Sequence, residues 1–482
     1  MLSVQASSRG AAQRRGFGRR VLIGPVDHRL TAHAGVAAVT EVNRILGVGS
    51  VLDAAIGAFK KRRRGVSAGG LLVSMACAQL SGQDFLVGMD RRRDDVAGQG
   101  LEPVPTPAST TTAQLAGRFT AEHLAGIEAG IATINARMVT LLPEHRRLQL
   151  LSVATIDGDT TDVEVYGRKK QDAVYNYQGQ RAYRPHITFW AEGGTPLAAD
   201  LMRADEDPRP VAADLLDRAV NALPPGVEKV QCRWDAGYFA ADLAIHCVQR
   251  GIDFAIGVKR NTAVVRACRS APADGWHPVI GMDNTEVATL GYLPGSWPKE
   301  AGISCLVRRT RIPVDQIPKD QRARKLRTID KAQLELALTG QIDHVHGYSF
   351  ILTNRDVSTP GRLVATEHWY RYRTDIEALN KDAKHGAALR HLPSKYRSVN
   401  AVWMWAALLA CAISTWIQEL AGLDNGRGRK RRTVTRMRRE LINIPARVVR
   451  TNRALTLRPP PEAGLLVTVL TALQAIPAAR AG

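Results

Sequence analysis

The chain has 482 residues, with 66 lysines and arginines against 45 aspartates and glutamates, which gives a net charge of +21. This length exceeds one ordinary core and predicts two or three domains of roughly 100–200 residues each. Apolar residues make up 45% and charged residues 23%, which is typical of globular proteins and argues against wholesale disorder. The excess positive charge indicates a polyanionic partner, with nucleic acid favoured over an anionic membrane.

The cysteines and histidines show no metal-binding spacing. The six cysteines contain no C-x-x-C pair, and the twelve histidines form no cluster with the spacing of metal ligands. This pattern argues against a structural zinc site and against a disulfide framework, and it favours the reducing cytoplasm.

The first 150 residues divide into a tail and a helical region. Residues 1–24 are rich in arginine and glycine and have no apolar stretch behind them, so we predict a disordered basic tail without a secretory signal. Residues 25–145 are predicted to form a helical domain, because apolar residues recur every three or four positions. The three segments with this pattern are Val36–Leu52, Gly70–Leu86 and Ala113–Leu142.

Residues 146–260 alternate between strand and helix patterns. The predicted strands are Leu148–Ile156, His186–Glu192, Thr195–Met202, Val227–Trp234 and Asp253–Val258. One helix is predicted to start at Asp207–Pro210, with proline tolerated in its first turn, and to end at Leu223. A second helix is predicted over Phe239–Arg250. The resulting order, βββαβαβ, predicts an α/β domain and is the strand order of ribonuclease-H-like folds.

The second half of the chain is predicted to contain an insertion, a return to the core and a basic end. Residues 261–346 are irregular and β-rich, and residues 347–422 resume with a strand, a long helix over Glu367–Lys384 and an apolar helix from Val399. Residues Ala401–Ile417 approach the length of a membrane span, about 17–20 residues. Polar residues within and directly after them favour a buried core helix instead. Residues 423–482 form a basic C-terminal region.

Three acidic positions stand at the predicted strand ends. Asp157 and Asp159 have the same parity on the first strand, so both are expected on one face of the sheet. Asp235 directly follows the fourth strand. Mg²⁺ is held by carboxylates together with substrate phosphates, and two such ions can clamp both oxygens of a phosphodiester displacement. An aspartate at a strand end is also a common turn or cap residue.

A fourth acid lies in the pattern Y-x2-R-x3-E-x6-K. This pattern consists of Tyr370, Arg373, Glu377 and Lys384. At about 100° per residue these side chains would follow one stripe of a single helix. The alternative reading is an ordinary solvated salt-bridge stripe.

These segments together resemble bacterial insertion-sequence DDE transposases with the Y-R-E-K signature, specifically the insertion sequence thirteen-eighty group, which is related to the insertion sequence four group. The resemblance covers roughly residues 25–455. Besides the Y-R-E-K residues, the matching motifs are Asp157–Thr161, Tyr183–Pro185, Arg233–Phe239 and Phe254–Gly257.

The resemblance implies a ribonuclease-H-like core interrupted by a β-rich insertion, with a catalytic and metal-binding triad of Asp159, Asp235 and Glu377. The expected cofactor is two Mg²⁺ ions, for which Mn²⁺ can substitute. Asp157 remains an alternative to Asp159 as the first acid, because both share one strand face. Asp162 is expected to be a turn residue.

The resemblance also implies DNA contacts outside the triad. Tyr370, Arg373 and Lys384 would bind phosphates beside the cut, and either Trp276 or Trp297 could stack on a flipped base unless it serves only in packing. The basic region Arg427–Arg458, including Arg431 and Arg432, is either a phosphate-contacting surface or a solvated basic face. Terminal-repeat recognition is expected near residues 60–64 of the helical domain.

The leading hypothesis is therefore a cytoplasmic bacterial DNA transposase, nucleoid-associated when bound to DNA. It would bind terminal inverted repeats as a synaptic homodimer without membrane association. It would then cut the element ends by Mg²⁺-dependent hydrolysis, pass through hairpin ends and join the 3′-OH ends to target DNA. The alternatives are another ribonuclease-H-fold endonuclease and an inactive or domesticated DNA-binding derivative.

Overall fold

The computed structural model describes residues 21–478 except 62–63, 270, 273, 321–323, 325–328, 424–430 and 453. Most of the predicted basic tail therefore lies outside the described residues.

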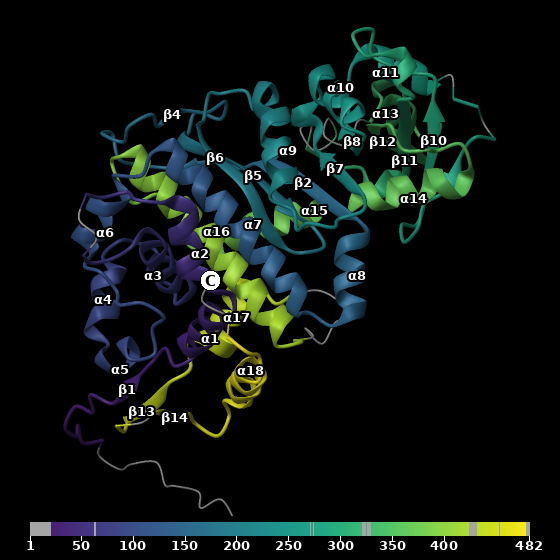
Figure 1. Ribbon diagram of the computed structural model, residues 1–482. Helices are drawn as coiled ribbons and strands as arrows, with labels where there is room; N and C mark the ends of the chain where they lie inside the picture. The colour runs from purple at the N-terminus through teal and green to yellow at the C-terminus, as the bar shows by residue number, and fades with distance from the viewer. Residues whose placement is uncertain are drawn as a thin grey trace, which may run out of the picture.

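The described chain is a mixed α/β structure (Figure 1). The helices are α1 (Val36–Leu46), α2 (Val48–Ile56), α3 (Ala68–Leu80), α4 (Gly88–Asp94), α5 (Val96–Gln99), α6 (Ser109–Ala116), α7 (Ala121–Leu141), α8 (Glu144–Ser152), α9 (Ala212–Asn221), α10 (Ala241–Gln249), α11 (Thr262–Arg269), α13 (Lys331–Leu338), α14 (Pro360–Arg371), α15 (Thr374–Gly386), α16 (Arg397–Leu420), α17 (Val434–Met437) and α18 (Gly464–Gln474). The strands are β1 (Leu30–Thr31), β2 (Ala154–Thr160), β3 (Val163–Glu164), β4 (Val174–Tyr175), β5 (Arg181–Trp190), β6 (Thr195–Arg203), β7 (Val230–Trp234), β8 (Asp253–Gly257), β9 (His277–Pro278), β10 (Thr285–Leu290), β11 (Ser304–Pro313), β12 (His344–Thr353), β13 (Ala446–Arg450) and β14 (Leu455–Arg458).

One large mixed sheet organises the molecule. Its central strands run in the order β6-β5-β2-β7-β8, in which β2, β7 and β8 are parallel and β5 is antiparallel to both of its neighbours. Along the chain, the main elements follow as β2, β5, β6, α9, β7, α10 and β8, which is the predicted βββαβαβ order. The parallel strands β2 and β7 end side by side, and Asp159 and Asp235 lie at their carboxyl ends.

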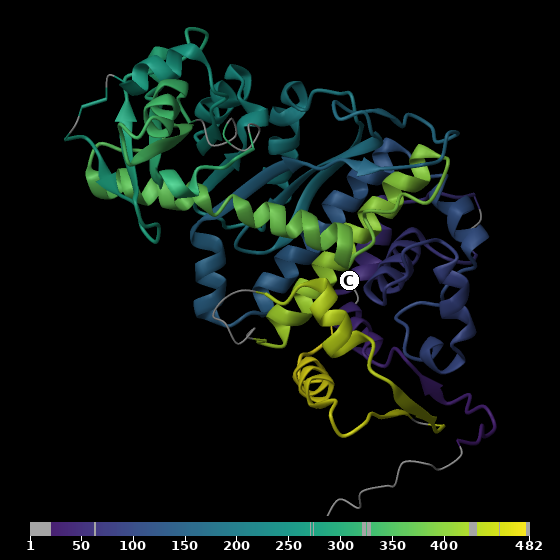
Figure 2. The ribbon, with the colours of Figure 1, turned by 180° about the vertical axis from the view of Figure 1, so that it is seen from behind.

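Helix α16 is the buried centre of the protein. Among the described helices it is the one long and apolar enough to cross a membrane, yet its whole apolar window lies inside the protein. It packs against α3, α7 and β6 and also contacts α15, past whose end it runs obliquely in Figure 2. The structure therefore confirms the predicted buried core helix.

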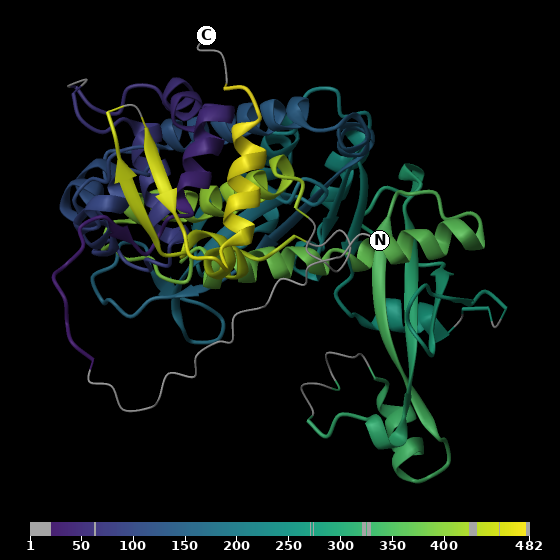
Figure 3. The ribbon, with the colours of Figure 1, turned by 90° about the horizontal axis from the view of Figure 1, so that it is seen from below.

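The β-rich insertion extends the same sheet. Strand β12 pairs with β8 on one side and with β11 on the other, and β10 and β9 follow. Figure 3 shows β11 and β12 projecting away from the main body. A small separate core of Ile312, Ile329, Ala337 and Val345 closes their far end.

The N-terminal helical region and the C-terminal region pack together. Strand β1 pairs with β13, and β14 completes a small three-stranded sheet. Helix α18 lies against α1, where Arg44 donates to the carbonyls of Leu473 and Ile476 at 3.2 and 2.9 Å (Figure 3). Two regions that the sequence separates thus share one core.

The segment predicted as the start of the first strand is helical. Helix α8 spans Glu144–Ser152, and β2 begins only at Ala154. The amides of Arg146 and Arg147 donate to the carbonyl of Pro143, which starts the helix, and Glu144 suits its first turn. The apolar run from Leu148 is too short for its periodicity to distinguish a helix from a strand.

The predicted long helix Glu367–Lys384 is two helices. Helix α14 ends at Arg371 and α15 begins at Thr374. At the junction, the amides of Arg373, Asp375 and Ile376 donate to carbonyls three residues earlier, which is the tighter 3₁₀ pattern. The Y-R-E-K residues therefore do not share one helix.

Candidate active site

Asp159 and Asp235 lie next to each other at the carboxyl ends of two central strands. Strands β2 and β7 pair with Gly158 opposite Trp234, and each aspartate is the next residue along its chain segment. A Cβ atom on Gly158 would lie 1.9 Å from the buried indole ring of Trp234. Glycine is thus required between the acids Asp157 and Asp159 for the strands to pack.

The Asp159 carboxylate is held by two donors. Its Oδ1 accepts from the amide of Thr160 at 2.8 Å, and its Oδ2 accepts from the Asn380 side chain at 3.1 Å. Burial, followed by the charge of Asp235, raises the pKa of Asp159 to about 7. No sequence motif pointed to Asn380, although it lies three residues after Glu377 and thus near the same face of α15.

Asp235 begins a tight turn that faces the same edge. Its Oδ1 accepts from the amide of Gly237 at 2.8 Å and thereby caps the 3₁₀ turn Ala236–Tyr238. This bond uses one carboxylate oxygen and fixes the direction of the other.

Arg373 lies among the acids. Its Nη2 is 3.2 Å from Oε1 of Glu377, whose side chain is 60% exposed. Burial alone would lower the pKa of Arg373. The pKa is nevertheless raised, because the electrostatic effects of Tyr370, Asp235, Asp159 and Glu377 together outweigh burial. One guanidinium therefore balances the negative charge of this cluster.

Asp157 has different surroundings from Asp159. Both lie on one face of the sheet, as their parity predicted, but Asp157 is fully buried and receives two hydrogen bonds of 2.6 Å from Arg233. The third Arg233 nitrogen donates to the carbonyl of Trp369 at 2.6 Å. Burial raises the pKa of Asp157 to about 6 despite Arg233. Both carboxylate oxygens of Asp157 are thus occupied by an internal ion pair.

Two residues expected to bind phosphate instead contact main-chain oxygens. The Tyr370 hydroxyl donates to the carbonyl of Trp234 at 3.1 Å, and burial raises its pKa to about 12. The Lys384 ammonium donates to the carbonyl of Asp162 at 2.8 Å, and burial lowers its pKa. These contacts give both residues a positioning role in this structure.

The two tryptophans of the insertion have packing partners. Trp297 is 4% exposed and stacks on Phe239 with ring centroids 5.6 Å apart. Trp276 is partly buried, and the Arg309 guanidinium lies 3.8 Å from its ring centroid. The packing alternative thus accounts for the observed position of each tryptophan.

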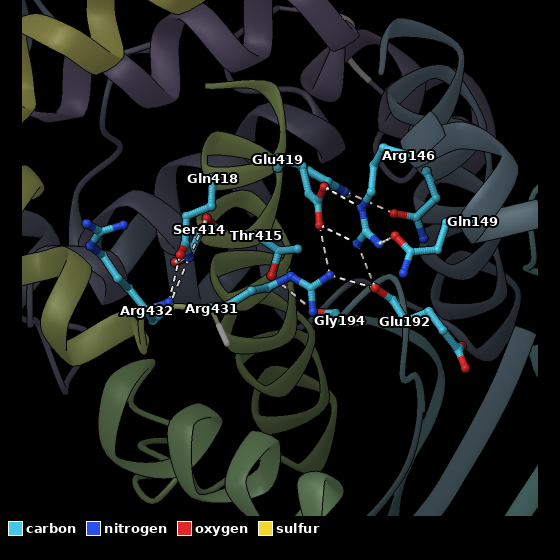
Figure 4. Close-up of polar contacts among 12 residues, drawn as sticks. Arg146, Gln149, Glu192, Gly194, Ser414, Thr415, Gln418, Glu419, Arg431 and Arg432 are labelled. Carbon is cyan, nitrogen blue, oxygen red and sulfur yellow. Dashed lines mark hydrogen bonds and ion pairs between the residues drawn. The ribbon is translucent and has the colours of Figure 1, made fainter. Parts of the chain in front are cut away.

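Arg431 and Arg432 fasten the C-terminal segment to the core (Figure 4). Arg431 donates to Glu419 at 2.9 Å and to the carbonyl of Glu192 at 2.7 Å. The amide of Arg432 donates to Gln418 at 2.7 Å, and its guanidinium lies 3.5 Å from Glu440. These contacts favour a structural role over the expected DNA contact.

The basic cluster at residues 60–64 is only partly described. Lys60 donates to the carbonyl of Arg64 at 2.9 Å, while Lys61 and Arg64 are exposed. Arg62 and Arg63 lie outside the described residues, as do Arg427, Arg429 and Lys430 of the C-terminal region.

The acidic cluster offers the donor chemistry of a hard divalent cation. Asp159 and Asp235 supply carboxylate oxygens, and the raised pKa of Asp159 reflects burial and a neighbouring negative charge that a cation would offset. Within the described part of the chain, however, no three His, Cys, Asp or Glu side chains are gathered closely enough to hold a metal ion. Glu377, which pairs with Arg373, would have to turn toward the other two acids.

The sequence matches the family described as Transposase DDE domain group 1 over residues 13–312 and 325–479. The chain belongs to this DDE transposase family. A cryo-EM structure of the piggyBac transposase synaptic complex with hairpin DNA is similar to the transposase at 9% identity, with a TM-score of 0.37 over 85% of this chain and 79% of that chain. None of the curated proteins matches the transposase. The assignment rests on the family match.

Family membership makes the protein a DNA transposase, an enzyme class that uses divalent metal ions. The paired carboxylates at the ends of β2 and β7 are the described feature that suits this chemistry.

Proposed function

We propose that this enzyme is an insertion-sequence transposase with a ribonuclease-H-like core that cuts the ends of its element in a Mg²⁺-dependent reaction. The observation that carries the proposal is the position of Asp159 and Asp235 at the ends of two adjacent parallel strands, with α15 across them. The strand order β6-β5-β2-β7-β8 supports the proposed core.

Asp159, Asp235 and Glu377 would hold two Mg²⁺ ions, or Mn²⁺ in their place. Bound Mg²⁺ would polarise the scissile phosphate and lower the pKa of the attacking water. Asn380 and the Thr160 amide orient Asp159, while the Gly237 amide orients Asp235. Asp159 is the proposed first acid, because both oxygens of Asp157 are bound by Arg233.

Arg373 would bind the DNA phosphate beside the cut. Its guanidinium lies among the acids, and Arg suits bidentate contact with a phosphate. When DNA binds, Arg373 would release Glu377 and bind the DNA phosphate in its place.

The reaction proposed is hydrolysis at the ends of the element followed by joining of the freed 3′-OH to target DNA. We propose a cut-and-paste pathway through hairpin ends, carried out by a homodimer on terminal inverted repeats. The proposed location is the bacterial cytoplasm, in association with the nucleoid. The net charge of +21 supports binding to a polyanion.

Cleavage of the element's own terminal repeat tests this function. The intact protein with Mg²⁺ is expected to cut a labelled duplex at the repeat boundary, whereas Glu377→Ala is expected to bind the duplex without cutting it. Because the Glu377 side chain is 60% exposed, its truncation should leave the fold intact.

Each other outcome has a defined meaning. Binding without cutting by both proteins would indicate an inactive or regulatory derivative. Cutting by both would show that Glu377 is not the third ligand. Cutting of unrelated duplexes at equal rates would indicate a general endonuclease rather than a transposase.

The metal-free protein should lose stability as the pH rises through the pKa of Asp159. The folded pKa of about 7 lies above the ordinary 3.8, so the neutral carboxyl favours folding. The contribution of the neutral carboxyl to stability is complete below about pH 4 and is lost as the pH rises to about 7. The resulting decrease in the free energy of unfolding is at most about 4 kcal/mol. Thermal unfolding without metal should therefore show Asp159→Asn more stable than wild type near pH 8, with a smaller gap near pH 5.

Metal addition provides the control for this prediction. Near pH 8, Mg²⁺ should raise the melting temperature of the wild type and leave that of Asp159→Asn nearly unchanged. Equal stability of the two metal-free proteins near pH 8 would contradict the assigned environment of Asp159.

A further inference from the structure

An open cavity of about 380 Å³ borders the acidic cluster. Thr160, the residue directly after Asp159, forms part of its wall. Gly237, two residues after Asp235, forms another part. Tyr177 forms another part, and its side chain is 84% exposed. The cavity therefore places an exposed aromatic ring beside the edge of the sheet where the acids lie.

Tyr177 lies in the turn directly after β4, a short strand that pairs with β5 and is labelled in Figure 1. The Asn176 side chain accepts from the amides of Gln178 and Gln180 at 3.0 and 2.9 Å. Gly179 adopts a positive φ of 76°, which closes the turn. The exposure of Tyr177 is thus built into the turn.

The turn is connected to the helix that carries Glu377. Asn176 donates to Asp162 at 2.9 Å, and Asp162 also receives Arg184 at 2.7 Å and, through its carbonyl, Lys384 of α15 at 2.8 Å. This chain of bonds fixes Tyr177 relative to the acidic cluster and gives Lys384 and Asp162 a positioning role.

The charges of the cavity are compatible with a nucleic-acid strand. The wall contains three acids, Asp205, Glu206 and Asp207. Arg203 binds Asp205 at 2.8 Å, Arg209 binds Asp207 at 2.5 Å, and Glu206 accepts from the amide of Arg203 at 3.1 Å. Lys259 adds a further positive charge to the wall. Exposed aromatic rings beside basic groups are the usual platforms for unpaired bases.

We propose that Tyr177 is a stacking platform for an unpaired base of the DNA strand that enters the acidic cluster. This inference rests on the proposed function, because the strand must continue from the cavity to the carboxylates. The occupant is DNA with single-stranded character, since every base has a face that can stack on the ring. A fully paired duplex would hide its bases and gain little from Tyr177.

Binding of two labelled duplexes by the full-length protein tests the proposal. One duplex carries a short thymine overhang, and the other has the same sequence with blunt ends. Tyr177→Ala is expected to weaken binding of the overhang duplex by about 5- to 150-fold and to leave the blunt duplex unchanged. Tyr177→Phe keeps the ring and should bind both duplexes like the wild type.

Tyr166 offers a matched control. It is also 84% exposed and lies in the same connection between β2 and β5, but it is not part of the cavity wall. Tyr166→Ala should bind both duplexes normally. With 5-iodouracil in the overhang, photocrosslinking should modify Tyr177 and spare Tyr166.

The outcomes separate this inference from the proposed function. If the wild type binds neither duplex, the proposed function fails and this inference with it. If the wild type binds both and Tyr177→Ala matches it, or if Tyr166→Ala loses as much affinity, only the stacking role fails. A change in oligomeric state on sedimentation of Tyr177→Ala, with DNA binding unchanged, would assign Tyr177 to a contact between protein copies instead.

Discussion

Asp235→Asn is expected to abolish cleavage of end DNA, by about three orders of magnitude or more, while DNA binding remains. Loss of the carboxylate charge removes a proposed metal ligand, which contributes several kcal/mol in the transition state. The fold should survive, because an amide oxygen can still accept the 2.8 Å hydrogen bond from Gly237. Cleavage in Mg²⁺ and gel-shift binding, measured on the same preparation, check both parts.

Asp242→Asn is the matched control for this variant. Asp242 is exposed and lies seven residues later, in the first turn of α10. It should cut at the wild-type rate. Cleavage by Asp235→Asn in Mg²⁺ would show that the site is wrongly assigned, and loss of both cleavage and binding would point to a folding defect.

Much of the acidic cluster could be predicted because it depends on local patterns. Strand parity placed Asp157 and Asp159 on one face, and the end of a strand placed Asp235 beside them. Parity could not distinguish the two acids of β2. That distinction depends on Arg233, which lies opposite Asp157 on the neighbouring strand β7 and binds its carboxylate.

The Y-R-E-K residues show where the helical pattern was insufficient. A regular helix would place all four on one stripe, but the junction after Arg371 turns Tyr370 toward Trp234. The junction is a change from i−4 to i−3 hydrogen bonding, which leaves no strong signal in the sequence. Tyr370 and Lys384 therefore bind main-chain oxygens, whereas Arg373 pairs with Glu377.

The basic and aromatic residues depended even more on distant partners. Arg431 was read as a DNA contact from its charge, yet Glu419 of α16 binds it in the folded protein. Trp297, one of the two candidates for stacking on a flipped base, is buried against Phe239, as the packing alternative expects. Tyr177 lies in a short connection whose exposure follows from the turn at Asn176 rather than from composition.

Arg233→Met is expected to destabilise the protein by about 3–5 kcal/mol, because it leaves the buried Asp157 carboxylate without its partner. Arg233 is 3% exposed and Asp157 is fully buried, so water cannot replace the lost bonds. The variant also removes the donor to the carbonyl of Trp369, which connects β7 to α14. Urea unfolding of the wild type and the variant at one pH measures the difference.

Two further variants separate the cost of the unpaired charge from general disruption. The double variant Asp157→Leu with Arg233→Met should recover much of the lost stability, since an apolar pair avoids burying a lone carboxylate. Arg209→Met breaks an equally short but exposed ion pair with Asp207 and should cost no more than about 1 kcal/mol. If Arg233→Met is no less stable than Arg209→Met, Asp157 is not held as a buried ion pair, and it becomes free to compete with Asp159 as the first acid.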